Sequence, residues 1–345
     1  MEVTYQGSPL TYTATGALNT PNLDISHYQI VRELGRGAFG ITYLAADNLG
    51  DQYAVKLIDY QAAVNKGATM ADILEEGNSL TALASGTCNP YLVCYYGSWD
   101  FTYQGSRYIA LVSDFVDGMT LRDWLAQPQN TNLPPTTLWP LITQLMLGLQ
   151  FVHKSGYAHR DIKPENIMIT KDLHIKYIDF GLACTRSCNG SVCVEGCTGE
   201  VGTVLYESPE IFNGTYRETL ASAQKRDIWA LILVCYELAG GNFRLPFTVS
   251  DSVGQWLPIS TIVQNIQFEN ILYPSYAFQD DGRTSTFLYR NVIRDPLVRP
   301  DVEALLASWT FTVVAVPLIS TQGPNIITGD RTIRTQLAPV TIFTR

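Results

Sequence analysis

One short stretch of the chain, HRDIKPEN at residues 159–166, carries three polar side chains that could take part together in one chemical reaction. Asp161 can accept or orient a proton, Lys163 is a fixed cation, and Asn166 offers a neutral oxygen to a metal ion. Taken alone, the octet is also compatible with a polar surface turn that contains a proline. Its interpretation therefore depends on the other motifs of the chain.

A glycine-rich run, LGRGAFGITYLA, lies nearer the N-terminus between two predicted strands. Its glycines, Gly35, Gly37 and Gly40, lack a Cβ and can bring backbone amides close to a polyphosphate. A dinucleotide-binding loop of this pattern would open a helix and be followed by an acid about 20 residues on. Here a second strand follows, and YAVK then places Lys56 within reach of phosphate oxygens. The pattern favours a loop that covers nucleotide phosphates.

A third motif, YIDFG at residues 177–181, follows a predicted pair of strands. Asp179 is a hard carboxylate, the type of ligand that suits a divalent cation bridging phosphates. The alternative interpretation is an ordinary turn at the end of a strand.

The elements that must position these motifs change in type along the chain. Strands are predicted at 28–34, 40–48, 51–59 and 107–115, with one helix at about 70–84 between them. From about residue 116 the pattern becomes helical: apolar residues recur at helical spacing over 138–156, and the run 228–238 is apolar nearly all round. The order is a small sheet region followed by a larger helical one.

The motifs, with SPE at 208–210, stand in the order found in the eukaryotic-type protein kinases, which the chain resembles over roughly residues 29–309. The resemblance implies an α+β, bilobal protein-kinase-like fold with a small β-rich N-lobe, which holds one main helix, and a larger, mostly helical C-lobe. It divides the chain into an N-terminal extension (1–27), the N-lobe (28–115), the C-lobe (116–309) and a C-terminal extension of unknown role (310–345).

The resemblance also assigns roles in phosphoryl transfer from ATP. Lys56 would pair with the α and β phosphates and be held by a glutamate of the helix at 70–84, either Glu75 or Glu76. We favour Glu76, because Leu80 four residues later would then pack inward from the same helical face.

The remaining roles fall on the two motifs described first. Asp179 and Asn166 would bind Mg²⁺, or Mn²⁺ in its place. Asp161 would accept or orient the proton of the substrate hydroxyl, and Lys163 would stabilise the γ-phosphate. The ATP-binding residues implied in this way are Leu34, Gly35, Gly37, Gly40, Thr42, Ala54, Lys56, Glu76, Ser113, Asp114 and Phe115. Thr42 stands where the family usually has valine, and Ser113 is a small residue at the rear of the nucleotide pocket.

The serine/threonine branch of the family is indicated by Lys163, two residues after Asp161, and by Thr203 in GTVLYESPE. Structural support is expected from Asp227 behind the catalytic loop and from an ion pair between Glu210 and Arg299. Two alternatives remain open. One is a pseudokinase that binds nucleotide and partner proteins without transfer, and the other is a small-molecule phosphotransferase, which the peptide-seating run GTVLYESPE disfavours.

Four cysteines, Cys184, Cys188, Cys193 and Cys197, are spaced C-x3-C-x4-C-x3-C after the DFG motif. They could be free thiols, bind Zn²⁺, or form a redox disulfide. Their spacing is only a moderate indication of zinc, because structural zinc sites favour C-x2-C pairs. Thr198 next to them is a candidate phosphorylation site that would pair with Arg160, although an unmodified threonine explains the sequence nearly as well.

Composition limits the partners. The formal net charge of −9 argues against nucleic acid, because binding to phosphate backbones depends on Lys and Arg. Protein substrates are expected, with a weak preference for basic peptides from Glu165 and the acidic balance. The longest apolar runs are too short to span a membrane and no secretory signal is evident, so a cytoplasmic or otherwise intracellular location with reduced thiols is expected. The oligomeric state is not indicated.

Overall fold

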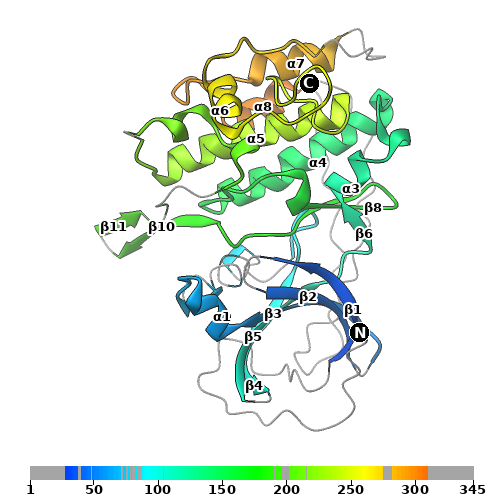
Figure 1. Ribbon diagram of the computed structural model, residues 1–345, viewed down its shortest axis with the longest axis vertical. Helices are drawn as coiled ribbons and strands as arrows, with labels where there is room; N and C mark the ends of the chain where they lie inside the picture. Colours follow the sequence, from blue (N-terminus) through cyan, green and yellow to red (C-terminus); the bar gives the residue numbers. More distant parts are fainter. Residues whose placement is uncertain are drawn as a thin grey trace. The chain divides into compact units, whose positions relative to one another are not determined.

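The computed structural model divides after Asp117 into two compact units. The residues it describes are 28–37, 40–47, 49–70, 73–74, 77, 79, 82–83, 88–103, 105–189, 192–195, 197, 202–214, 216–274 and 282–309. Each unit has its own core and is described by itself, with element labels as in Figure 1. Within the described part, no helix combines the length and the apolar composition needed to cross a membrane.

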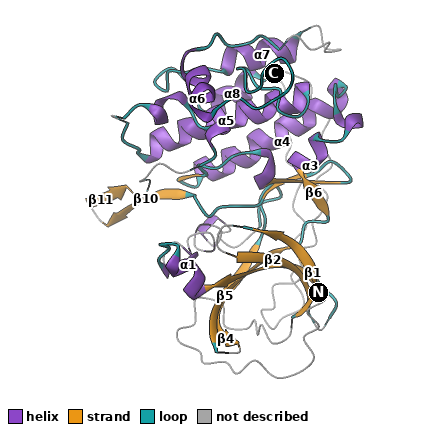
Figure 2. Cartoon of the chain, viewed as in Figure 1, coloured by secondary structure: helices purple, strands orange, loops and turns teal. Residues whose placement is uncertain are grey.

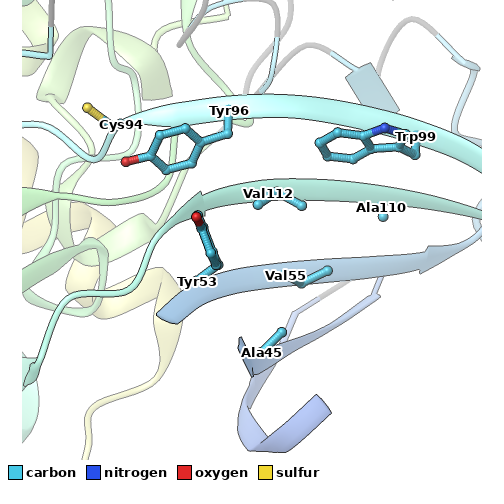
Figure 3. Packing of buried hydrophobic residues seen from close by; sticks show 8 residues of the cluster. All are labelled: Ala45, Tyr53, Val55, Cys94, Tyr96, Trp99, Ala110 and Val112. Atoms are coloured by element: carbon cyan, nitrogen blue, oxygen red, sulfur yellow. The ribbon is translucent and has the colours of Figure 1, made fainter. Parts of the chain in front are cut away.

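The first unit is built on one antiparallel sheet of five strands in the order β1-β2-β3-β5-β4. The strands are β1 (Gln29–Arg36), β2 (Gly40–Ala46), β3 (Gln52–Asp59), β4 (Tyr95–Tyr103) and β5 (Ser106–Asp114). One face of this sheet carries an apolar cluster, shown in Figure 3, made by Ala45, Tyr53, Val55, Cys94, Tyr96, Trp99, Ala110 and Val112. Tyr53 meets Tyr96 edge to face with ring centroids 5.5 Å apart, a favourable aromatic geometry.

The opposite face of the sheet is covered by helical chain. Helix α1 (Tyr60–Asn65) begins where the Asp59 carboxylate accepts a hydrogen bond from the Ala62 backbone N–H at 2.9 Å, a side-chain N-cap. The described positions between 70 and 83 are helical as well. Ile73 from this segment packs with Ile58 of β3 and with Ile109 and Leu111 of β5.

The second unit is mostly helical, with two small sheets (Figure 2). Its helices are α3 (Leu121–Leu125), α4 (Pro135–Lys154), α5 (Leu220–Gly240), α6 (Ile259–Phe268), α7 (Arg283–Asn291) and α8 (Val302–Ser308). One sheet has the order β6-β8-β9, from β6 (Gly118–Thr120), β8 (Ile167–Thr170) and β9 (Ile175–Tyr177). The other has the order β11-β10-β7, from β7 (Tyr157–Ala158), β10 (Cys184–Asn189) and β11 (Val192–Glu195).

Helices α4 and α5 lie side by side at the centre of this unit, α7 packs on α5 and α8 packs on α4. Every residue of α5 from Arg226 to Ala239 is buried, as its apolar run predicts. Thr219 and Ser222 form a reciprocal capping box at the start of α5. The core helices therefore form a rigid base for the loops that carry the motifs.

The observed elements follow most of the predicted ones. The four predicted strands correspond to β1, β2, β3 and β5, and the predicted helix at 138–156 corresponds to α4. Several elements were not predicted, and for two of them the reason can be read from the structure. Strand β4 contains Gly97 and a register shift between Tyr95 and Gly97, which obscures its alternation, and α1 is only six residues long, too short to show a helical period.

Candidate catalytic and nucleotide-binding site

The first unit places four of the predicted nucleotide-binding residues on one face of its sheet. Thr42 of β2 is paired with Lys56 of β3, and Ala54 is paired with Ser113 of β5. Paired residues in a sheet share a face, and so do residues two apart along a strand. Thr42, Ala54, Lys56 and Ser113 therefore face the same way, opposite to the aromatic cluster of Figure 3.

The three glycines of the loop between β1 and β2 differ in what they permit. A Cβ on Gly40 would lie 2.3 Å from the Leu57 carbonyl oxygen, so only glycine allows β2 to approach β3 there. Gly35 has no neighbour within 4 Å of a Cβ, and Gly37 has only the Gly40 carbonyl oxygen at 3.9 Å. Gly40 is thus a packing requirement, whereas Gly35 and Gly37, which follow half-buried Leu34, leave open space above their backbone.

Two further predicted residues, Asp114 and Phe115, lie elsewhere in the first unit. The Asp114 side chain is on the face of the aromatic cluster, where it accepts hydrogen bonds from the Tyr96 hydroxyl at 2.6 Å and the Cys94 backbone N–H at 3.2 Å. Phe115 follows directly after β5 and is half-buried. Glu75 and Glu76 are outside the described residues, so the choice of partner for Lys56 stays a prediction.

The second unit brings the residues of the HRDIKPEN loop together around the Asp161 carboxylate. Lys163 Nζ donates to Asp161 Oδ2 at 2.6 Å and to Thr203 Oγ1 at 2.7 Å, and Thr203 Oγ1 donates to Asp161 Oδ1 at 3.0 Å. Asn166 Nδ2 donates to the Asp161 backbone oxygen at 2.9 Å and to Oδ2 at 2.8 Å. The predicted proximity of Thr203 to the catalytic loop is confirmed.

The loop is fixed from beneath by Asp227 of α5. Its carboxylate accepts the backbone N–H of His159 at 2.7 Å and of Arg160 at 2.8 Å, and it contacts His153 Nε2 at 2.9 Å. Burial would raise the pKa of Asp227, but the hydrogen bond with His153 and the hydrogen bond from the His159 backbone, with the electrostatic influence of both residues, hold its pKa below the ordinary value. The predicted bracing role of Asp227 is confirmed by these contacts.

Asp179 and its neighbours pack against the same loop. The Phe180 ring lies 4.7 Å from the His159 ring, centroid to centroid, and both side chains are buried. Burial lowers the pKa of His159, so the imidazole is neutral at physiological pH and packs as an aromatic ring. The Ile178 backbone N–H donates to the Asn166 backbone oxygen at 3.0 Å, which joins the segment before Asp179 directly to the catalytic loop.

Asn166 and Asp179 fit the expected Mg²⁺. Because the Asn166 Nδ2 group donates both its bonds to Asp161, its amide oxygen Oδ1 is turned away from them and is left as an acceptor. Asp179 Oδ1 accepts the Gly181 backbone N–H at 3.0 Å. The two side chains thus supply oxygen donors, the type that Mg²⁺ prefers.

The buried ion pair expected behind the SPE motif is also present. Arg299 Nη1 and Nη2 donate to the two carboxylate oxygens of Glu210 at 2.8 and 2.9 Å, and the Arg299 side chain is fully buried. This confirms the predicted pair, which joins the segment at 208–210 to the start of α8.

The structure contradicts two of the three hypotheses for the cysteine cluster. Cys184 and Cys197 are joined by a disulfide across Cα atoms 5.0 Å apart, and Cys88 and Cys94 are joined in the first unit across Cα atoms 5.4 Å apart. Both spans lie in the range for disulfides. A four-thiolate zinc site and four free thiols are therefore wrong for this cluster, and the expectation of reduced thiols holds only for buried Cys235 among the described side chains.

The other two cysteines of the cluster lie on paired strands. Cys188 of β10 is paired in register with Cys193 of β11, although their side chains are outside the described part. Among the described residues, no group of three or more His, Cys, Asp or Glu side chains is arranged to hold a metal ion. Thr198 is also outside the described residues, so its phosphorylation stays a prediction.

Two charged networks near the loop were not predicted. Arg122 of α3 donates to Glu165 Oε1 at 2.9 Å and pairs with the buried Glu237. Glu165 is therefore neutralised within the chain, which weakens the reason for expecting basic peptide substrates. The second network joins Arg160 and Arg226 through carboxylates. No local pattern predicts these contacts of Arg122 and Arg160, because their carboxylate partners are 43 to 115 residues away in the sequence.

The comparison with known families agrees with this geometry. The family model for the protein kinase domain matches residues 28–308, so the chain belongs to the protein kinase family. The predicted fold class, with a β-rich N-lobe and a mostly helical C-lobe, is confirmed. Kinases of this family transfer a phosphoryl group from ATP to proteins.

Several curated proteins are similar over most of the chain. It is 30% identical over 250 residues to the serine/threonine-protein kinase cds1 of Schizosaccharomyces pombe, covering 70% of this chain and 50% of cds1. It is 32% identical over 229 residues to the serine/threonine-protein kinase PrkC of Bacillus subtilis, covering 66% and 32%. It is 28% identical over 301 residues to the interferon-induced, double-stranded RNA-activated protein kinase of Rattus norvegicus, covering 82% and 52%. The chain spans about half the length of these relatives or less.

Proposed function

We propose that the chain is an active protein serine/threonine kinase that transfers the γ-phosphoryl group of ATP to Ser or Thr hydroxyls of proteins. The observation that carries the proposal is the set of hydrogen bonds around Asp161, in which Lys163, Asn166 and Thr203 each contact its carboxylate. A carboxylate fixed by three donors is oriented before a substrate arrives, and positioning is most of what phosphoryl transfer requires.

The residues of this arrangement account for the steps of transfer. Asp161 accepts or orients the proton of the incoming hydroxyl, whose oxygen forms a new bond to the γ-phosphorus while the bond to the β-phosphate oxygen breaks and ADP leaves. Lys163 lies 2.6 Å from Asp161 and carries the positive charge that stabilises the transferring group. When bound, Mg²⁺ on Asn166 and Asp179 neutralises charge on the phosphates.

Serine and threonine specificity is supported by the contact of Lys163 with Thr203. Lys163 Nζ joins the catalytic loop to the segment that leads into SPE, the segment expected to seat a substrate peptide. All three relatives described above are protein kinases, and two of them are named serine/threonine-protein kinases. The identity of the physiological substrate is not implied by these features.

The test is transfer of radiolabelled phosphate from ATP to a generic Ser/Thr peptide, with nucleotide binding measured in parallel. Asp161→Asn and Lys56→Met should each lower turnover on the order of 10²-fold or more. Glu303→Gln is the control, because Glu303 is an exposed residue of α8 whose only described ion pair, with Lys154, is 3.7 Å long. ATP binding by the wild-type chain without any transfer would favour the pseudokinase alternative.

A further inference from the structure

Arg160 is held in an unusual position next to the catalytic aspartate. Its backbone φ is +66°, in the left-handed region that non-glycine residues rarely occupy, and its N–H is fixed by Asp227. Its guanidinium reaches forward, where Nε donates to the Leu182 carbonyl oxygen at 2.7 Å. Arg160 thus connects the catalytic loop to the residue that follows the DFG motif.

The same guanidinium is paired with a carboxylate of this chain. Arg160 Nη1 donates to Glu218 Oε2 at 3.1 Å, and the side chains of Arg160 and Glu218 are 8% and 4% exposed. The other Glu218 oxygen accepts from Arg226 of α5. One buried carboxylate therefore bridges two guanidinium groups, an arrangement that forms strong charge-assisted hydrogen bonds.

The network continues toward the substrate segment. Arg226 Nη2 donates to Glu207 Oε2 at 2.7 Å. A Cβ on Gly202 would lie 1.9 Å from Glu207 Oε1, so this carboxylate rests against the backbone just before Thr203. Arg160, Glu207 and Arg226 line one small pocket together with Asp161 and Thr203. The contacts thus run from Leu182 through Arg160, Glu218, Arg226 and Glu207 to the backbone of Gly202, which directly precedes Thr203.

In the described part of this network, each guanidinium group meets at least one carboxyl group. Two buried guanidinium groups face two buried carboxylates, Glu207 and Glu218. A phosphate on the segment after DFG would order it by pairing with clustered guanidinium groups, which is the role considered above for Thr198. Glu218 already supplies a negative partner to both arginines.

We propose that Glu218 is a positioning residue that holds Arg160, and through it the segment around Leu182 and Thr203, in the place where a phosphate would otherwise be needed. It follows that transfer by this chain does not require phosphorylation of that segment. This inference rests on the proposed kinase function, but its structural part can be measured separately.

The experiment compares the full wild-type chain with Glu218→Gln, Glu218→Asp and the exposed control Glu303→Gln. Glu218→Gln keeps the size and removes the charge, whereas Glu218→Asp keeps the charge on a shorter side chain. Amide hydrogen exchange of residues 182–186 and 203–208 reports the position of the segment. Peptide phosphorylation, measured before and after treatment with a broad-specificity phosphatase, reports transfer.

Wild type should keep its activity after phosphatase treatment. Glu218→Gln should lower kcat on the order of 10²-fold, the effect of misplacing catalytic groups by about 1 Å, while the KM for ATP changes less than about twofold. Exchange at 182–186 and 203–208 should be faster in this variant, and Glu218→Asp should recover part of both effects. Since Glu218→Asp keeps the charge, it also serves as the test variant if Glu218→Gln does not fold.

Two results would overturn the inference. One is unchanged exchange in both Glu218 variants, whatever their activity, and the other is loss of wild-type activity after phosphatase treatment. If wild type transfers no phosphate under any condition while the Glu218 variants still loosen the segment, the proposed function fails and the positioning role of Glu218 stands.

Discussion

The buried ion pair between Glu210 and Arg299 allows a quantitative test of how burial governs electrostatics in this chain. Arg299 makes two hydrogen bonds to Glu210 and three more to the carbonyl oxygens of Lys225, Ile293 and Arg294, at 2.7 to 2.9 Å. The variant Arg299→Met fills similar volume but leaves the buried Glu210 carboxylate without its cation. Breaking a buried pair from one side costs about 3–5 kcal/mol, because the remaining charge is not compensated.

The exposed pair between Arg36 and Glu33 provides a matched control. Arg36 also donates two hydrogen bonds to one carboxylate, both at 2.8 Å, but the two side chains are 66% and 39% exposed. Water already solvates these charges, so Arg36→Met should change stability by about 0–1 kcal/mol. Each arginine thus donates two hydrogen bonds to one carboxylate, but Arg299 is buried and also bonds three backbone carbonyl oxygens, whereas the Arg36 pair is exposed.

The free energy of unfolding would be measured by urea titration with tryptophan fluorescence, to which Trp229 reports directly because its ring centroid lies 5.5 Å from the Arg299 guanidinium. A loss of 3–5 kcal/mol corresponds to a decrease in Tm of about 10 °C in a domain of this size. Adding Glu210→Gln to Arg299→Met should recover part of the loss, because no unpaired carboxylate then remains. Equal losses in Arg299→Met and Arg36→Met would refute the reasoning.

Three further outcomes are expected. Ser113→Met should reduce the use of adenine analogues with bulky substituents roughly tenfold or more in peptide phosphorylation while ATP is still used; equal use by both proteins would contradict a small residue behind the nucleotide. Burial raises the pKa of the Glu207 carboxyl group from 4.5 to about 7. The folded chain therefore binds the carboxyl proton more tightly than the unfolded chain, and the free energy of unfolding should decrease as the pH rises from 4.5 to about 7. Urea titrations at several pH values should show a smaller decrease in Glu207→Gln, and an unchanged slope would exclude Glu207 as its source. Peptide mapping of the unreduced chain should recover Cys184 linked to Cys197, and reduction should lower stability by about 3 kcal/mol; full labelling of both thiols before reduction would contradict the disulfide.

Local sequence patterns were sufficient to predict much of this protein. The apolar run 228–238 predicted the buried helix α5, because a helix that is apolar all round has no face for solvent. The alternating runs predicted β1, β2, β3 and β5, and the order of the motifs placed Asp161, Asn166 and Asp179 in one chemical role. The helix, the strands and the motifs each depend on the spacing of residues that are close together in the sequence, so they can be recognised from the sequence alone.

The tertiary structure alone decided which distant charges and thiols meet. Arg160 and Glu218 are 58 residues apart and Arg122 and Glu237 are 115 apart, and no local period relates them. Cys184 has three candidate partners within 13 residues, and only the path of the chain through β10 brings Cys197 to it. Residue type makes such pairs possible, but the path of the backbone through the core fixes which of them form, because a buried charge or thiol can bond only with the groups that packing places beside it.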